Sequence, residues 1–319
     1  MHHHFQPTKV VLIQSPLIDS TLYKFCGSVF DGEHTWFCPL SEKFIARVKG
    51  HSVEAICSFP ASLKWNGRMF HGCVFDGTFI WLVPCDATAV VRIHYKTAKM
   101  DALTNWPPSF QLVDNAFYDG VFDGRFVWLL PYNAACIVKI DVTSCEMIAV
   151  PLPGYKPQSF FSGCFDGQKV WLAPWDAKEL VWVDKDTSAV TKYTMKPYPP
   201  SSAFCGAVFD GTNVWLVPYC APEPVRVMSD GSMKSFGIWP KNFQKGKNAF
   251  VGGLCIGDDV VLLPFSSTSV VCVNKSNGSM RAFPHGGVSD TGGFFFGGTW
   301  DGSRLLLAPS HASSIVTLE

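Results

Sequence analysis

The sequence lacks the cysteine patterns that would assign it to a metal-binding or disulfide-stapled class. It has 12 cysteines, but it contains no CxxC pair and no Cys/His spacing typical of a zinc site. The cysteines lie mostly inside apolar runs such as FCGAVF and VVCVN, which favours buried, reduced thiols. We therefore expect a cytoplasmic protein with no metal and no other cofactor.

Long apolar runs and an excess of charge are absent as well. No stretch approaches the roughly 18 apolar residues of a membrane-spanning helix, and VVLIQSPL near the N-terminus is too short and poorly flanked for a signal peptide. Lys plus Arg and Asp plus Glu both number 26, so the net charge is zero. This balance argues against nucleic acid or an anionic membrane surface as a partner.

Common enzyme motifs and helical patterns are missing too. The sequence contains no G-x-S-x-G elbow, no H-E-x-x-H pair and no phosphate-binding loop. No segment sustains a 3.6-residue apolar period, so helix should be scarce.

One phrase recurs along the chain, typified by FHGCVFDGTFIWLVP at residues 70–84. Its last proline falls at Pro39, Pro84, Pro131, Pro174, Pro218, Pro264 and Pro309, at intervals of 45, 47, 43, 44, 46 and 45 residues. Seven such units account for nearly the whole chain, so we expect a single domain over residues 9–319. Residues 1–8 should form an N-terminal tail, whose MHHH is either a tag remnant or native.

Each unit predicts four short strands. The FxGxVF run is the first, a DG hairpin turn follows, and the VWLV run is the second strand, which ends at the proline. Runs such as AVVRIHY and CIVKIDV give the third strand, and a more polar segment gives the fourth. Four-stranded units of this length are typical of a β-propeller.

The two ends of the chain predict how the ring closes. The last unit stops after its third strand, at SSIVTLE, and the segment TKVVLIQSP before the first unit is an unclaimed strand. If residues 9–14 pair with residues 314–318, the last blade gains its fourth strand and no edge stays free. We therefore expect an all-β, seven-bladed propeller whose last blade is closed by the N-terminal strand.

The DGxxxWLVP core resembles the DGxxxW phrases of lyase-type and surface-layer-type propellers. The resemblance covers essentially the full chain. The pattern departs from WD repeats, because no unit ends in Trp-Asp and none carries the Gly-His pair, and it lacks the double glycine of kelch repeats at the usual place. The resemblance implies a propeller fold, and propellers carry many unrelated activities.

The repeated aspartates and tryptophans are interpreted as folding residues. Catalytic groups are rarely needed once in every blade, whereas Asp suits a tight turn, as Asn also does, and Trp can fill the space between blades. A ring of aspartates around a cation is a poor alternative, because each unit supplies one carboxylate. The residues concerned are Asp31, Asp76, Asp123, Asp166, Asp210 and Asp301, with Trp36, Trp81, Trp128, Trp171 and Trp215.

Two positions depart from the repeat. The sixth unit has Ile256 where Asp belongs and Val261 where Trp belongs, which we interpret as drift rather than as a contact seam. The residue between Phe and Gly of the first strand varies, and His71 is the only imidazole at that place. It is interpreted as a core residue, with a role in a central pocket as the alternative.

The functional face is expected where the loops differ. Strands alternate in direction, so the DG turns share one end of the ring, while the second turns and the unit-to-unit connections share the other. Variable loops on a rigid scaffold are where function usually lies, and aromatic and basic side chains are enriched at interfaces. The candidate partner-binding residues at that end are Trp65, Tyr132, Trp175, Tyr219, Trp239, Lys241, Lys245 and Lys247.

These observations favour a non-enzymatic scaffold, a monomeric ring or a subunit of a larger complex, which binds a protein or peptide on the variable-loop face. One alternative is a lyase or hydrolase working in the central cavity, for which the candidates are His285, His311, Asp114, Asp290 and Glu223. Another is a glycan-binding module, although the aromatic residue after the proline recurs only in units three to six.

Overall fold

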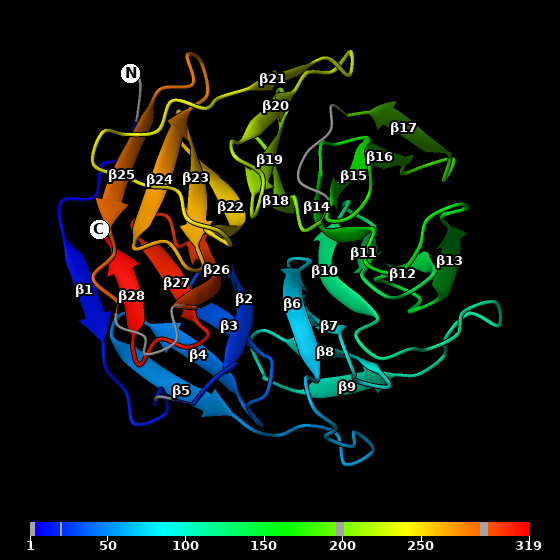
Figure 1. Cartoon of the computed structure of the whole chain (residues 1–319). Coiled ribbons are helices and arrows are strands. Elements are labelled where there is room, and N and C mark those ends of the chain that lie inside the picture. The colour runs from blue at the N-terminus through cyan, green and yellow to red at the C-terminus, as the bar shows by residue number, and fades with distance from the viewer. Residues whose placement is uncertain (1–3, 20, 196–200, 288–292) are drawn as a thin grey trace.

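The computed structural model describes residues 4–19, 21–195, 201–287 and 293–319. This part of the chain holds 28 strands and no helix. The strands form seven four-stranded antiparallel sheets, arranged as blades around a common axis (Figure 1). The prediction of a seven-bladed, all-β propeller is confirmed. Among the described residues there is accordingly no helix long and apolar enough to cross a membrane.

The blades share one order of strands from the axis to the rim. The inner strands are β2 (Phe25–Phe30), β6 (Phe70–Phe75), β10 (Phe117–Phe122), β14 (Phe160–Phe165), β18 (Phe204–Phe209), β22 (Phe250–Ile256) and β26 (Phe295–Trp300). The second strands are β3 (Thr35–Pro39), β7 (Phe79–Pro84), β11 (Phe126–Pro131), β15 (Lys169–Pro174), β19 (Val214–Pro218), β23 (Asp259–Pro264) and β27 (Leu305–Pro309). The third strands are β4 (Ile45–Lys49), β8 (Val90–His94), β12 (Cys136–Asp141), β16 (Glu179–Asp184), β20 (Val225–Val227), β24 (Ser269–Asn274) and β28 (Ile315–Leu318). The outer strands are β5 (Ser52–Ile56), β9 (Met100–Leu103), β13 (Met147–Pro151), β17 (Val190–Thr194), β21 (Met233–Ser235), β25 (Met280–Pro284) and β1 (Val10–Ile13).

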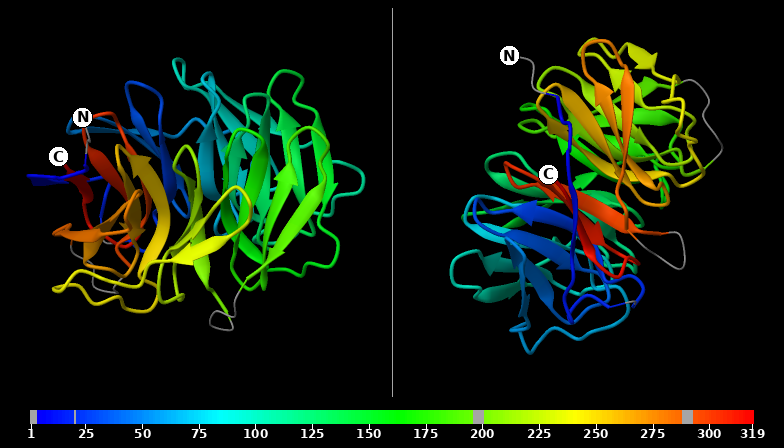
Figure 2. Two further views of the ribbon diagram at one scale, coloured as in Figure 1. Left: turned by 90° about the horizontal axis from the view of Figure 1, so that it is seen from above. Right: turned by 90° about the vertical axis from the view of Figure 1, so that its left-hand side faces the viewer.

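The N-terminal strand closes the ring as expected. In the last blade β1 pairs antiparallel with β28, with Val10 opposite Leu318 and Ile13 opposite Ile315. In both views of Figure 2 this strand, in blue, lies at the outside of the red C-terminal blade. Inner strands contact one another in closed order, from β2 through β6, β10, β14, β18 and β22 to β26 and back to β2. The last blade therefore gains a fourth strand that the C-terminal end of the chain does not supply.

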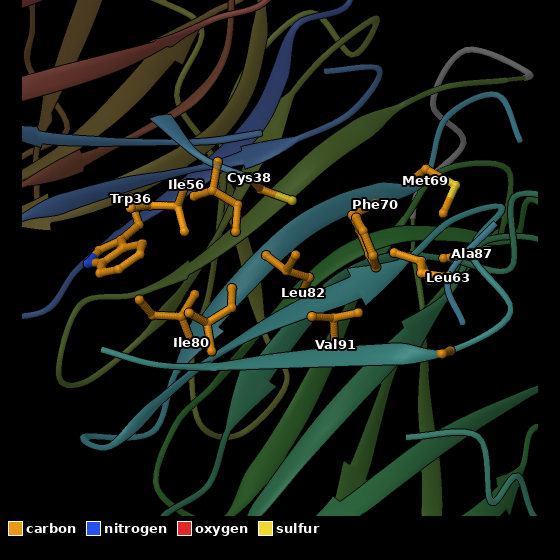
Figure 3. Close-up of a cluster of buried hydrophobic side chains, with 13 residues drawn as sticks. Trp36, Cys38, Ile56, Leu63, Met69, Phe70, Ile80, Leu82, Ala87 and Val91 are labelled. Atoms are coloured by element: carbon orange, nitrogen blue, oxygen red, sulfur yellow. The ribbon is translucent and has the colours of Figure 1, made fainter. Parts of the chain in front are cut away.

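The core lies between neighbouring blades, in the spaces that the second strands fill. Trp36 of the first blade is fully buried and belongs to one hydrophobic cluster with Phe70, Ile80 and Leu82 of the second blade (Figure 3). Trp81 belongs in the same way to a cluster with Phe117, Val127 and Leu129 of the third blade. Each tryptophan thus joins its own blade to the next one, and its burial ties the ring together.

The DG turns place one glycine, and no aspartate, in the left-handed region. Gly77 has φ 96° and Gly124 also has φ 96°, whereas the preceding aspartates do not have positive φ. The aspartate side chain has a different role in the turn. Asp76 Oδ1 accepts hydrogen bonds from the backbone N–H of Thr78 and of Phe79, at 2.7 and 2.6 Å. The side chain itself therefore closes the turn.

A side chain from near the N-terminus packs against the irregular sixth blade. Phe5 is buried in the cluster that contains Val261, the residue at the tryptophan position. Its ring lies edge-on to Trp300, with the two centroids 5.7 Å apart, and its backbone N–H donates to Asp259 Oδ2 at 2.7 Å. Residues 1–8 were expected to form a tail, yet Phe5 adds an aromatic ring where this blade lacks its tryptophan.

Candidate functional site

The repeated aspartates and tryptophans are bonded to one another. In five blades the Trp Nε1–H donates to an Asp Oδ2 at 2.6–2.7 Å, while Oδ1 of the same Asp accepts from the turn backbone. In the last blade Leu306 stands at the tryptophan position, and Arg304 Nε donates to Asp301 Oδ2 at 2.8 Å instead. Both oxygens of each carboxylate are thus used in folding. The pairs are Asp31 and Trp36, Asp76 and Trp81, Asp123 and Trp128, Asp166 and Trp171, and Asp210 and Trp215.

Three of the predicted partner residues form an arc around the axis. Tyr132, Trp175 and Tyr219 each follow the proline of the second strand, and Phe265 continues the series. Ring centroids are 6.5 Å apart between Tyr132 and Trp175, 5.0 Å between Trp175 and Tyr219, and 6.0 Å between Tyr219 and Phe265. We call these four residues the aromatic arc. All four are half-buried, and they pack on the buried ring of Phe161 and its neighbours. The arc therefore covers the centre of the ring at the variable-loop end.

Two other predicted residues, Trp65 and Trp239, cap the spaces between blades. Trp65 lies edge-on to Phe59, with centroids 5.1 Å apart, and Trp239 stacks on Phe250 at 5.9 Å. The indole Nε1–H of Trp239 donates to the carbonyl oxygen of Pro222 at 3.1 Å. Trp106, which the sequence analysis did not single out, caps the second and third blades similarly and donates to the carbonyl oxygen of Thr88 at 2.9 Å.

The predicted lysines do not form one basic cluster. Lys245 Nζ donates to the carbonyl oxygen of Tyr219 at 2.9 Å, so it lies beside the aromatic arc, and burial lowers its pKa. The carbonyl oxygen of Lys247 accepts a hydrogen bond from Ser266 Oγ at 2.8 Å. Lys241 lies apart, in a groove with Trp239.

That groove, which we call the rim groove, lies between the outer strand β21 of the fifth blade and the turn from β24 to β25 of the sixth. Its volume is about 610 Å³. The connection between these blades supplies Ile238, whose residue surface is 87% exposed. Among the described residues that line it there is no Asp or Glu. The lining includes Lys234, Phe236, Ile238, Trp239, Lys241 and Met280.

A second hollow lies on the axis, next to the inner strands. This central cavity has a volume of about 170 Å³, and residues from the start of the inner strands line it. Each of these strands has an irregular register just after its first phenylalanine, which sets these residues out of the regular ladder. The cavity therefore brings together residues from separate blades, including His71, Asp119, Ser162 and Ser28.

Asp119 is the acidic group of the central cavity. Burial raises the pKa of its carboxyl to about 6, and hydrogen bonds from Ser162 and from the backbone N–H of Gly120 and Gly163 oppose that shift. The Gly120 N–H donates to Asp119 Oδ1 at 2.8 Å. The residue stands where four other blades have a glycine with positive φ, in the phrase FYDG instead of FxG. The aspartate in place of a repeated glycine is visible in the sequence, but it was not identified there as a candidate site residue.

His71 is neutral and held in place. Burial lowers the pKa of its imidazole to about 3. Its ring stacks on Tyr118 with centroids 4.0 Å apart, and its Nδ1 lies 2.5 Å from the carbonyl oxygen of Tyr118. Because a carbonyl oxygen only accepts, Nδ1 carries the proton in this hydrogen bond and Nε2 does not.

The candidates for an enzyme site are not gathered in one place. His285 is buried, and its ring nitrogens bond to the carbonyl of Ser267 at 2.9 Å and to the N–H of Gly287 at 3.0 Å. His311 lies against Tyr23, with centroids 4.6 Å apart. Asp114 is exposed before the third blade, Glu223 follows the second strand of the fifth, and Asp290 lies outside the described residues. No group of three His, Cys, Asp or Glu residues in the described part of the chain could hold a metal ion.

Comparison with known proteins identifies the fold. No protein-family model matches the chain, and neither does any curated protein. Among solved structures, a catalytically inactive His-to-Ala variant of virginiamycin B lyase from Staphylococcus aureus with quinupristin is 16% identical, with a TM-score of 0.74 over 97% of this chain and 98% of the other. A streptogramin B lyase is 14% identical, with a TM-score of 0.70 over 98% and 97% of the two chains. The expected likeness to lyase-type propellers is confirmed at the level of fold.

An unrelated activity appears on the same fold. Hydrazine synthase of Kuenenia stuttgartiensis is 12% identical to the chain, with a TM-score of 0.70 over 96% of this chain and 98% of the other. At such identities the likeness shows the fold alone, and function has to be argued from this chain's own residues.

Proposed function

We propose that this propeller is a non-enzymatic scaffold that binds a protein or peptide partner in the rim groove, through the variable connection between the fifth and sixth blades. The observation that carries the proposal is Ile238, which is 87% exposed between the buried Phe236 and the half-buried Trp239. Covering an isoleucine of this kind with a partner contributes about 2 kcal/mol. The apolar residues beside it, Phe236 and Trp239, are already packed in the hydrophobic cluster of the sixth blade, so they need little rearrangement on binding.

The charge of the groove selects the kind of partner. Lys234 and Lys241 line it, and one carboxylate, that of Glu223, lies against the lining residue Gly237, so the described lysines outnumber the acid there. A segment that carries Asp or Glu next to a large apolar residue complements this surface. Trp239 is held by its bond to the Pro222 carbonyl and presents a fixed aromatic edge, which suits an interface hot spot.

In this proposal the other predicted partner-binding residues stabilise the propeller and do not contact the partner themselves. Trp65 and the aromatic arc are packed on aromatic neighbours, so they hold the loops from which a partner is bound. All 12 cysteines are free, which supports the proposed cytoplasmic location. A monomeric ring or a subunit of a larger complex is compatible with a groove on the rim.

A second candidate is a lyase or hydrolase acting in the central cavity. The observation in its favour is Asp119, whose pKa of about 6 would allow it to exchange a proton near neutral pH. An enzyme of this kind would lose its activity in Asp119→Asn, whereas a scaffold would keep its partner in that variant.

Peptide selection tests the scaffold proposal without a known partner. Random linear peptides displayed on phage are selected on the wild-type protein, and the enriched peptides are synthesised and titrated by calorimetry. We expect acidic, apolar peptides, whose affinity falls at least about tenfold in Ile238→Asp. Val113→Asp is the matched control, because Val113 is an exposed aliphatic residue on another connection. The proposal is wrong if the enriched peptides bind Ile238→Asp as tightly as they bind the wild type.

A further inference from the structure

We propose that the central cavity is a binding site for a small organic ammonium ion, with the Asp119 carboxylate as its counter-ion and aromatic rings around it. The cavity lies on the axis of the ring, so this inference does not rest on the rim groove. Nothing in the folding role of the inner strands requires an acid at this place, since the corresponding positions Gly27 and Gly72 carry no side chain.

The charge balance of the cavity is the first argument. No Lys or Arg is among the described residues that line it, so the carboxylate has no cation beside it. Burial keeps four other titratable groups in the lining uncharged near neutral pH. Burial lowers the pKa of His71, and it raises the pKa of the thiols of Cys26 and Cys205 and of the Tyr118 hydroxyl. Cys73 is a further thiol of the lining. A buried anion that has hydrogen-bond donors but no counter-charge favours a cationic ligand.

An unused hydroxyl is the second argument. Ser28 lines the cavity from the first blade, and its Oγ is buried without a hydrogen-bond partner in the described part of the molecule. Buried polar groups are nearly always bonded, so an orphaned one indicates a missing ligand or water. Ser28 and Asp119 belong to different blades, and a ligand with a polar group at each end could reach both.

The remaining lining suits an organic cation. The rings of Tyr118, Phe161 and Phe296 border the cavity, and aromatic rings attract ammonium groups within about 6 Å of the ring centre. A volume of about 170 Å³ admits a compact molecule, since an apolar cavity of about 150 Å³ holds benzene.

A metal ion fits the same residues less well. Ca²⁺ takes about six to eight oxygen ligands, and Mg²⁺ about six. The described lining offers one carboxylate, with thiols, aromatic rings and glycine backbone for the most part. An ammonium ion needs one counter-charge and tolerates apolar neighbours, so it is the better match.

Titration with choline tests the inference, and its uncharged carbon analogue 3,3-dimethylbutan-1-ol is the matched control ligand. Calorimetry should show saturable binding of choline by the wild type and at least about tenfold weaker binding of the alcohol. Methylammonium, tetramethylammonium and putrescine extend the panel, and KCl and CaCl₂ test inorganic cations. Choline binding should weaken as the pH falls through about 6, where Asp119 gains a proton.

Asp119→Asn removes the charge at nearly constant volume, and Ser28→Ala removes the orphaned hydroxyl. We expect about a tenfold or greater loss of choline affinity in the first variant, with an unchanged circular dichroism spectrum, and a smaller loss in the second. The inference is overturned if no ammonium ion of the panel binds at millimolar concentration, if the alcohol binds as well as choline, if CaCl₂ competes with choline for the site, or if Asp119→Asn keeps the wild-type affinity.

Discussion

The indole of Trp128 donates a hydrogen bond of 2.7 Å from Nε1 to Oδ2 of Asp123, while Oδ1 of the same carboxylate accepts from the N–H groups of Arg125 and Phe126. One side chain thus closes the hairpin turn and positions the tryptophan that packs against the next blade. The sequence predicted both residues as folding residues, but their direct bond is visible only in the structure.

This bond changes the expectation for Asp123→Asn. An amide offers one accepting oxygen, so its NH₂ group would face either the indole N–H or the turn N–H groups, and one donor would lose its partner. We expect a loss of about 1–3 kcal/mol in the free energy of unfolding, with binding functions unaffected. Asp230→Asn is the matched control in urea denaturation, because Asp230 caps an exposed turn through Ser232 alone. Equal losses in the two variants would show that the tryptophan bond contributes nothing.

Trp128→Ala should cost more than any change at Asp123. The side chain is fully buried between the third and fourth blades, and removing a buried aromatic ring costs about 3–5 kcal/mol. Trp128→Phe keeps most of the ring but loses the N–H, so its unfolding midpoint should lie between those of Trp128→Ala and the wild type. A Phe variant as unstable as the Ala variant would point to the hydrogen bond rather than to packing.

Phe5→Ala should destabilise the protein although it lies near the N-terminus. The ring of Phe5 packs against Trp300 and Phe283 in the cluster where Val261 replaces the usual tryptophan. We expect a loss of about 3 kcal/mol by thermal or urea unfolding. Gln6→Ala, a change at a neighbouring exposed residue, is the control and should have little effect. If the two variants unfold alike, the segment is a tail without a packing role.

Closure by β1 predicts that a chain starting at Ser15 loses cooperative stability. Its last blade would lack the fourth strand, and β28 would present an unpaired edge. A broader unfolding transition and concentration-dependent association are expected, measured by calorimetry and light scattering. Thermal unfolding identical to that of the full chain would rule out this role for the strand.

The pH dependence of stability should report on Asp119. Its pKa is about 6 in the folded protein and 3.8 in the ordinary state, so between these values the folded state holds a proton that the unfolded state has released. The contribution of Asp119 to the free energy of unfolding is therefore fully present below about pH 4. It is lost as the pH rises to about 6, and the total change in the free energy of unfolding is at most about 3 kcal/mol. As the pH rises from 4.5 to 7.5, the free energy of unfolding of Asp119→Asn should therefore increase relative to that of the wild type. Asp114→Asn, a change at an exposed carboxyl, should show no such gain.

The fold could be predicted because its signals repeat. The DG turn, the tryptophan and the proline recur at intervals of 43 to 47 residues, and the unmatched strands at the two ends indicated the closure. Each signal is local, so periodicity and turn chemistry were enough to locate the blades.

The site was less accessible from sequence because it depends on single residues that do not repeat. Tyr132 and Trp239 looked alike as loop aromatics, yet one lies in the aromatic arc and the other caps a space between blades at the rim groove. Ile238 was an ordinary aliphatic residue until its exposure was known, and Asp119 differed from its counterparts by one letter. Such distinctions depend on the positions of the loops in the folded structure, which no local sequence pattern encodes.

A matched pair of variants separates folding residues from functional ones most directly. Asp123→Ala and Ile238→Asp are each compared with the wild type for the midpoint of thermal unfolding and for affinity toward a peptide selected on the wild type, below the unfolding temperature. We predict that Asp123→Ala lowers the midpoint and keeps the affinity, while Ile238→Asp keeps the midpoint and loses at least about tenfold in affinity. The opposite pattern, with the peptide lost from folded Asp123→Ala and retained by Ile238→Asp, would contradict both assignments.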